Sequence, residues 1–101
     1  MNSPYSISDA AGFDFDEIML HTMEAAGPAV ALKVHDEIER GFERIAAHPH
    51  LIGHIRSDVP DERVRALRVF AYLIFYYPDT DPIEILRIIH GSRDIPAAFE
   101  D

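Results

Sequence analysis

The stretch that decides the fold is residues 64–90, which read VRALRVFAYLIFYYPDTDPIEILRIIH. Residues 71–77 are rich in β-branched and aromatic side chains and are apolar on both faces, which is typical of a strand at the centre of a sheet. Residues 64–69 and 83–90 read as the strands on either side, and the turn at residues 78–82 separates the second pair. We therefore expect a small antiparallel sheet.

Two helices are predicted before this sheet. Ser8 and Asp9 are both good N-cap residues for a first helix that ends at Gly27-Pro28, and a second helix is expected over about residues 28–47. The apolar residues at helical spacing are Phe15, Ile18, Met19, Thr22, Met23 and Ala26 in the first helix, and Ala31, Val34, Ile38, Phe42 and Ile45 in the second. Gly27 joins the two segments, since glycine favours a helix end. A link this short predicts a helical hairpin, whose apolar stripes must be buried against the sheet.

The two ends of the chain complete the predicted architecture. Residues 4–8 read as a short N-terminal edge strand, and Asp94 is placed to cap a last helical turn. We predict an α+β fold in which a short N-terminal strand and a two-helix hairpin pack on a small antiparallel β-sheet. The length of 101 residues indicates one domain over residues 1–101.

Composition excludes several classes of function. The net charge is -9, from 18 acidic and 9 basic residues, which argues against direct DNA binding and against attraction to anionic membranes. The absence of cysteine excludes disulfides and thiol catalysis. The N-terminus lacks a signal peptide, and the longest apolar run, residues 69–77, is too short to span a bilayer. We expect a soluble cytoplasmic protein with no membrane association.

Histidines and arginines are the candidates for chemistry. His48, His50 and His54 crowd one loop, but their spacing matches no zinc signature, so we expect no metal site and no cofactor. The chain has one basic cluster, made of Arg56, Arg63, Arg65 and Arg68. Three acids within the same segment neutralise much of it: Asp58, Asp61 and Glu62. This cluster fits a recognition patch or a solvated, salt-bridged edge.

A second group lies around the last strand. His90, Arg87, Arg93 and Tyr76 could converge at the end of the sheet, where a ribonuclease would need a base, an acid and a cation. The simpler interpretation is that a carboxylate holds Arg87 and that His90 ends the strand. We favour the simpler interpretation, because structural ion pairs outnumber catalytic ones.

Four segments carry a resemblance to a known family. Residues 72–76 read YLIFY, residues 84–94 EILRIIHGSRD, residues 14–18 DFDEI, and residues 42–49 FERIAAHP. Together they resemble the ParE branch of the RelE/ParE superfamily, the toxins of type II toxin–antitoxin modules, over residues 5–99. The family fold is a short strand, a helical hairpin and a three-stranded antiparallel meander, which agrees with the fold predicted from periodicity.

The resemblance implies a function and partners. Toxins of the ParE type inhibit DNA gyrase by protein–protein contact, without being enzymes. A ParD-like antitoxin neutralises them in a hetero-oligomer, and such modules serve plasmid stabilization. The positions that match the family's structural motif are Tyr72, Arg87, His90 and Asp94.

Two sets of contact residues follow as expectations. Arg65 and Arg93 match family positions and can reach solvent, so we expect them to contact the target. Leu20, Leu51 and Ile52 stand outside the predicted apolar stripes, so we expect them to contact the antitoxin. With a toxin charge of -9, charge complementarity favours basic residues on the antitoxin tail.

Two alternatives remain open. RelE-like relatives are ribosome-dependent mRNA endonucleases, but this chain has a single lysine, Lys33, and ends in AAFED without a terminal histidine or tyrosine. It could also be an attenuated toxin that retains only antitoxin binding. The family often has Gly-Arg before the YLIFY segment where this chain has Phe70-Ala71, so we expect the hairpin turn there to differ.

Overall fold

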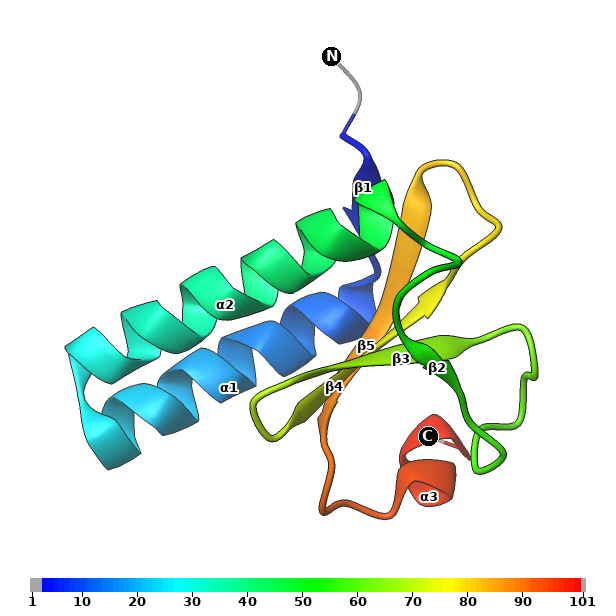
Figure 1. Ribbon diagram of the computed structural model, residues 1–101. Coiled ribbons are helices and arrows are strands. Elements are labelled where there is room, and N and C mark those ends of the chain that lie inside the picture. Colours follow the sequence, from blue (N-terminus) through cyan, green and yellow to red (C-terminus); the bar gives the residue numbers. More distant parts are fainter. Residues whose placement is uncertain (1–2, 101) are drawn as a thin grey trace.

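The apolar strand predicted for residues 71–77 lies at the centre of a five-stranded sheet. The computed structural model describes residues 3–100, and its strands follow the spatial order β1-β5-β4-β3-β2. The elements along the chain are β1 (Tyr5–Ile7), α1 (Asp9–Ala26), α2 (Pro28–Ala47), β2 (His54–Ile55), β3 (Arg65–Val69), β4 (Tyr72–Tyr77), β5 (Ile83–His90) and α3 (Ile95–Glu100). The hairpin of α1 and α2 covers one face of the sheet, and α3 packs on the other (Figure 1). The predicted α+β class is confirmed.

Strand β4 explains why the sheet has two covered faces. Ile74 and Tyr76 belong to the core beneath the hairpin, while Leu73 and Phe75 belong to the core beneath α3. Ile74, Phe75 and Tyr76 have no exposed surface. Because side chains alternate across a strand, a segment that is apolar at every position needs cover on both sides.

The sheet is mixed, which corrects the expectation of an antiparallel sheet. Strand β1 pairs with β5 in parallel, with Tyr5 opposite Ile83, whereas the neighbouring pairs from β5 to β2 are antiparallel. The edge position predicted for the N-terminal strand is confirmed. Strand β2 was not predicted, because two residues are too few to show an alternating pattern.

A β-bulge changes the faces of β5. Phe75 lies opposite Arg87 and Tyr76 lies opposite Ile85, so Leu86 is the extra residue on β5. Regular alternation along residues 83–90 would put Ile85 and Ile89 on one face. Instead, Ile85 packs beneath the hairpin and Ile89 packs beneath α3. The expectation was wrong because one inserted residue shifts every later side chain to the opposite face.

The helical hairpin has the predicted ends. The Ser8 hydroxyl accepts a hydrogen bond of 3.0 Å from the backbone N–H of Ala11, and Gly27 ends α1 with φ 88°. Asp94 likewise caps α3, since its carboxylate accepts a hydrogen bond from Ala97. No helix within residues 3–100 is both long and apolar enough to cross a membrane.

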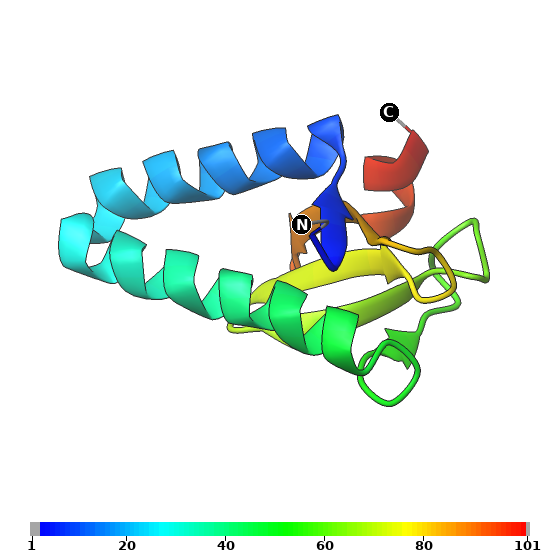
Figure 2. The same cartoon turned by 90° about the horizontal axis from the view of Figure 1, so that it is seen from above.

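The hairpin extends beyond the sheet that it covers (Figures 1 and 2). On α2 the expected stripe is buried at Ala31, Ile38, Phe42 and Ile45 and partly buried at Val34. On α1 the buried stripe stops at Thr22, and the expected members Met23 and Ala26 are exposed. The prediction fails at these two positions because the hairpin tip lies beyond the sheet.

Two turns depend on a left-handed backbone. Phe70, between β3 and β4, has φ 54°. This is the position where the family often has glycine, which adopts positive φ without steric cost. Gly53 has φ 75°, and a Cβ there would lie 2.3 Å from the Tyr76 hydroxyl. Gly53 therefore has both a conformational and a steric reason to be glycine.

Candidate functional site

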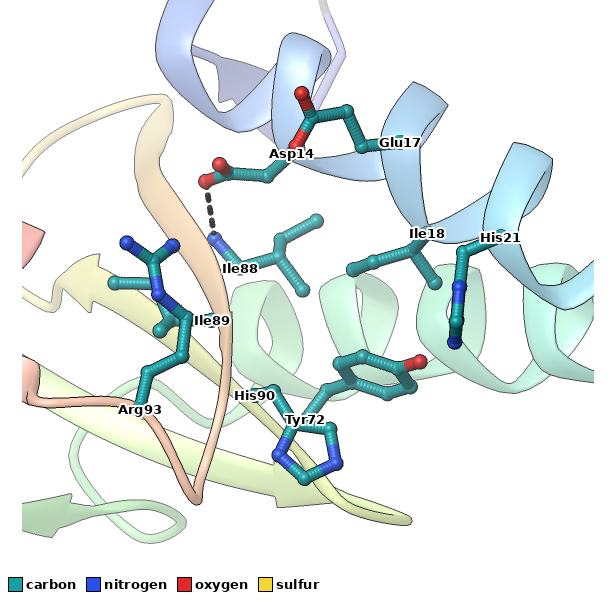
Figure 3. Close-up of a pocket in the computed structure, with 9 residues that line it drawn as sticks. All are labelled: Asp14, Glu17, Ile18, His21, Tyr72, Ile88, Ile89, His90 and Arg93. Carbon is teal, nitrogen blue, oxygen red and sulfur yellow. Dashed lines mark hydrogen bonds between the residues drawn. The ribbon is translucent and has the colours of Figure 1, made fainter.

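An open groove lies between α1 and the C-terminal end of β5, with a volume of about 340 Å³. Its walls are formed by Asp14, Glu17, Ile18, His21, Tyr72, Ile88, Ile89, His90 and Arg93 (Figure 3). The four α1 residues follow each other at spacings of three, one and three, so one side of the helix lines the groove. We call this feature the β5 groove.

Asp14 fixes the upper wall of the β5 groove. Its carboxylate accepts hydrogen bonds from Nε of Arg87 at 2.8 Å and from Nη2 at 3.1 Å. The same carboxylate accepts from the backbone N–H of Ile88 at 2.9 Å, as Figure 3 shows. Nη1 of Arg87 donates to the carbonyl of Ala98 at 2.8 Å. One arginine therefore ties α1, β5 and α3 together.

The ion pair expected for Arg87 is thus present, with Asp14 as its partner. The side chain of Arg87 is 18% exposed and that of Asp14 is 12% exposed. At this burial a guanidinium and a carboxylate need each other, because either alone would lose hydration without compensation. This pairing holds Arg87 behind Asp14, which lines the β5 groove, and Arg87 itself is not one of the lining residues.

His90 and Tyr72 form the lower end of the β5 groove. They lie opposite each other on β5 and β4, and their rings meet edge to face with centroids 5.5 Å apart. The backbone N–H of Ser92 donates to Nδ1 of His90 at 3.1 Å, and the Ser92 hydroxyl lies 2.7 Å from the same atom. Since a backbone N–H can only donate, neutral His90 carries its proton on Nε2. In this form the ring offers a donor, whereas a general base needs a free lone pair.

The charge of the β5 groove is mixed. Its lining residues include one arginine, Arg93, and two carboxylates, Asp14 and Glu17. Arg93 and Glu17 are exposed. This balance is unlike the concentrated positive charge that a phosphate-binding surface needs.

Arg65 and Arg93, the two residues expected to contact the target, lie at opposite ends of the sheet. Strands β3 and β5 are both antiparallel to β4, so they run in the same direction. Arg65 begins β3, whereas Arg93 follows the end of β5. Counting strand directions would have shown this from the sequence.

Besides Arg93, Arg68 on β3 also lies near the C-terminal end of β5. Its Nε donates to the carbonyl of Phe70 at 2.9 Å, and its Nη1 would lie 3.6 Å from a Cβ at Gly91. Arg68 is exposed, as is Arg93. Sequence reasoning placed Arg68 only in the basic cluster and missed this position.

Tyr76 does not belong to the β5 groove, contrary to one of the expected groupings. Its hydroxyl donates to the carbonyl of Ile52 at 2.7 Å, and Nη1 of Arg65 donates to the carbonyl of His50 at 2.9 Å. Burial raises the pKa of Tyr76, and nearby Arg65 partly opposes this change. Tyr72, the first residue of β4, lies next to His90 instead.

Two arginines of the basic cluster, Arg56 and Arg63, are paired with carboxylates of the same loop. This agrees with the interpretation of the cluster as a solvated, salt-bridged edge. Arg56 binds Asp58 with nitrogen–oxygen distances of 2.8 and 2.6 Å. Arg63 binds Asp61 with distances of 3.0 and 2.8 Å. Hydrogen bonds from Arg63 and from the Tyr77 hydroxyl hold the pKa of Asp61 well below its usual range.

The residues expected to contact an antitoxin have different environments. Leu20 on α1 is 62% exposed and Leu51, after α2, is 83% exposed. Ile52 is partly buried and packs against the core beneath the hairpin, so its expected exposure is wrong. Leu20 and Leu51 lie on separate elements, because Leu20 is in α1 and Leu51 is in the loop that follows α2.

One family model matches most of the chain, and a solved structure shares its fold. A sequence model described as "ParE toxin of type II toxin-antitoxin system, parDE" matches residues 5–95. A solved structure titled "Chromosomal ParDE TA system from P. aeruginosa" is similar with a TM-score of 0.73 and 22% identity, over 85% of this chain and 92% of that chain. At this identity the likeness shows the fold alone. None of the curated proteins compared with the chain matches it.

Proposed function

The chain belongs to the ParE toxin family of type II toxin–antitoxin modules, and from this premise we propose that it inhibits DNA gyrase by direct protein contact and is neutralised by a ParD-like antitoxin. The module would act in the cytoplasm, where gyrase works, and would support plasmid stabilization. The proposal needs no cofactor and no catalytic residue.

The Arg87–Asp14 ion pair is the observation that carries the proposal. A nuclease needs a cation that is free to stabilise charge on the scissile phosphate. Arg87 instead donates to Asp14 and to the carbonyl of Ala98, which are both protein groups. His90 adds to this, because Nδ1 accepts a hydrogen bond from Ser92. The β5 groove is therefore better suited to contact with a protein than to acid–base chemistry.

Arg93 is our proposed contact with gyrase. It is exposed at the edge of the β5 groove, and Arg68 is exposed near the same end of the sheet. Arginines that become buried when a complex forms are frequent anchors of protein interfaces. Arg65, at the opposite end of the sheet, takes part only if the gyrase surface extends across several strands.

The antitoxin would cover exposed apolar residues. Leu20 and Leu51 are the proposed contacts, and Ile52 contributes its exposed part. With a net charge of -9 on the toxin, a tail that carries lysine and arginine is favoured. The antitoxin and toxin would form a hetero-oligomer.

The test uses purified gyrase and plasmid DNA. We expect the chain to block supercoiling and to trap cleaved DNA. We expect Arg93→Ala to weaken inhibition at least ~10-fold without lowering the melting temperature. Arg40→Ala, an exposed arginine on α2, is the matched control and should leave inhibition unchanged. Equal effects of the two substitutions would contradict the role of Arg93.

A second candidate function is ribosome-dependent mRNA cleavage. The observation in its favour is that the β5 groove brings His21, Tyr72, His90 and Arg93 together. Loss of a general acid or base typically costs ~10²–10⁴-fold in rate. If the chain cleaves mRNA during translation and a folded His90→Ala protein does not, the gyrase proposal is wrong. Silence in both assays with antitoxin binding retained would indicate an attenuated toxin.

A further inference from the structure

A histidine and two carboxylates meet on the surface of α2. His35, Asp36 and Glu39 each offer one donor atom, and these three atoms lie within 4.8 Å of one another. Nδ1 of His35 is 3.3 Å from Oδ1 of Asp36 and 3.4 Å from Oε1 of Glu39. We call this group the α2 triad. Within residues 3–100, no other three histidine or carboxylate donors lie this close together.

The helix brings the α2 triad together. Residues four positions apart lie on one face of a helix, so the imidazole of His35 and the carboxylate of Glu39 are neighbours. Asp36 follows His35 directly, and its carboxylate turns toward the same ring nitrogen. The ring of His35 packs against that of Phe15 on α1, with the two centroids 5.2 Å apart. Helix α1 thus supports the ring while Nδ1 faces the two carboxylates.

The spacing of the donor atoms fits a small divalent cation. Ligand atoms at about 2.0–2.1 Å from a tetrahedral metal ion lie ~3.3–3.4 Å from one another. The two distances from Nδ1 of His35 have this size. The side chains of Asp36 and Glu39 are 52% and 49% exposed, so they have the freedom to bring both oxygens onto the same ion.

The charge of the α2 triad also suits a cation. An ion pair between protonated His35 and the carboxylates uses the same contacts, but surface pairs of this kind contribute little to stability. Neutral His35 with its proton on Nε2 offers the lone pair of Nδ1 to a metal ion. The two carboxylates then balance the charge of a divalent ion, and the net charge of -9 on the chain attracts cations.

We propose that the α2 triad binds a divalent transition-metal ion, with Zn²⁺ as the best fit. The ligands would be Nδ1 of His35 and one oxygen each of Asp36 and Glu39, with water in the fourth position. A nitrogen ligand favours Zn²⁺ over Mg²⁺ and Ca²⁺, which prefer oxygen. The bound ion would hold one turn of α2. The inference goes beyond gyrase inhibition, because it concerns neither the β5 groove nor an antitoxin contact.

The α2 triad is separate from the loop histidines that the sequence singled out. His50 lies 3.2 Å from Asp79, and no third donor of the described residues joins this pair. The expectation of no metal site followed from the spacing of known zinc signatures, which a triad within one turn of a helix does not match. His50 therefore serves as a control, since it is a histidine with a single carboxylate partner.

The experiment titrates the full chain, without an affinity tag, with zinc chloride in a calorimeter. We expect one ion per chain with half-saturation below about 0.1 mM free Zn²⁺. A ~10-fold excess of Mg²⁺ should not compete. Co²⁺ serves as a coloured probe, because a tetrahedral Co²⁺ site absorbs visible light much more strongly than the hydrated ion. In NMR spectra, Zn²⁺ should move the ring resonances of His35 before those of the other histidines.

Variants assign the binding to the α2 triad. His35→Gln and Glu39→Gln should each weaken Zn²⁺ binding at least ~10-fold, because even the loss of a group that supports a ligand costs ~10–100-fold. Both side chains are partly exposed, so the melting temperature without metal should change little. The controls are His50→Gln and Glu37→Gln, a carboxylate of α2 that pairs with Arg40. They should leave Zn²⁺ binding unchanged.

Several results would overturn the inference. These are no binding at about 1 mM Zn²⁺, unchanged binding by His35→Gln, equal weakening by His50→Gln, or equal competition from Mg²⁺. Resonances of His35 that stay in place as Zn²⁺ is added would show that the contacts are an ion pair only. No gyrase or antitoxin is present in this assay, so its failure leaves the proposed function standing, and the gyrase assay can fail without affecting it.

Discussion

The two helices of the hairpin differ in what they do with their outward sides. Helix α2 buries Ile38, Phe42 and Ile45 completely, and its outer side carries charges of both signs, including the ion pair of Arg40 with Glu37. Helix α1 buries less and carries only negative charge outside, together with Phe13 and Leu20. Both outer sides also expose apolar side chains, since Leu32 on α2 is as exposed as Leu20 on α1, at 62% each. The two outer sides therefore differ in charge balance, and the mixed charges of α2 can pair with each other in water.

The inward sides of the two helices also differ. Phe42 on α2 packs its ring against those of Tyr5 and Phe15, at centroid distances of 5.3 and 5.8 Å. On α1 the stripe is interrupted by Asp14, which binds Arg87 instead of packing in the apolar core. Helix α2 thus holds the fold mainly by apolar burial, and α1 holds it partly by one ion pair.

The largest expected effect is at Phe42. Phe42→Ala removes a ring with no exposed surface, and such a change in a core costs about 3–5 kcal/mol of unfolding free energy. Phe13→Ala, the same substitution at a ring on α1 that is 72% exposed, should change this free energy by less than ~0.5 kcal/mol. Urea unfolding followed by circular dichroism measures both. Similar losses in the two variants would show that Phe13 is buried in solution.

The next effect separates the two carboxylates Asp14 and Asp16. Asp14→Ala removes the carboxylate that accepts from Nε and Nη2 of Arg87 and from the Ile88 amide, which should cost about 2–3 kcal/mol. Asp16→Ala removes an exposed carboxylate two residues away, and should stay within ~0.5 kcal/mol.

A double-mutant cycle identifies the cause of the Asp14 effect. Arg87→Ala and Asp14→Ala together should cost less than the sum of the single losses, because each single change leaves the other partner buried without its ion pair. Additive losses would mean that the two side chains do not stabilise each other.

Much of this comparison could be predicted from the sequence. The central strand, both helices and their junction at Gly27 follow from patterns in which each residue's type matches its local environment. The same holds for the carboxylate partner of Arg87, since a strand arginine among isoleucines has to be paired. These features depend on short-range residue patterns and on the need of a buried arginine for a carboxylate partner.

The rest depended on details that periodicity does not contain. The bulge at Leu86 moves Ile89 to the α3 side of the sheet. No residue in this part of the sequence is of a type that indicates a bulge. The parallel pairing of β1 and the separation of Arg65 from Arg93 depend on strand direction. The exposure of Met23 depends on how far the hairpin extends past the sheet.

Each helix contains a glycine, and replacing it by alanine should change the unfolding free energy in opposite directions on the two helices. Gly12→Ala on α1 adds a methyl group into open space, and should raise the unfolding free energy by about 0.5–1 kcal/mol, because alanine favours a helix. At Gly41 on α2 a Cβ would lie 2.9 Å from Cδ1 of Ile74 and 3.0 Å from Cγ2 of Val69. Crowding in a packed core costs about 1–3 kcal/mol, so Gly41→Ala should lose about 1 kcal/mol overall.

Thermal and urea unfolding of the two glycine variants measure these signs. A higher unfolding free energy in both variants would contradict the expected difference, and would show that the contact of α2 with β3 and β4 is loosely packed. A loss in both would show that Gly12 is needed by the α1 backbone.

The smallest effect concerns Asp61, a carboxylate that is paired with Arg63 of its own loop, in contrast to the exposed carboxylates of α1. Hydrogen bonds from Arg63 and Tyr77 lower the pKa of Asp61 relative to its usual value. A carboxyl group with a lowered pKa in the folded state stabilises the fold above the pKa of the unfolded chain, about 3.9. As the pH falls below this value, the unfolded state takes up the proton first, and the stabilisation is progressively lost.

Asp61→Asn should therefore lower the melting temperature at pH 7 by a small amount that shrinks at pH 3. Tyr77→Phe, which removes one donor to Asp61, should show a weaker form of the same pH dependence. A difference between Asp61→Asn and the parent protein that is equal at both pH values would mean that the pairing with Arg63 does not persist in solution.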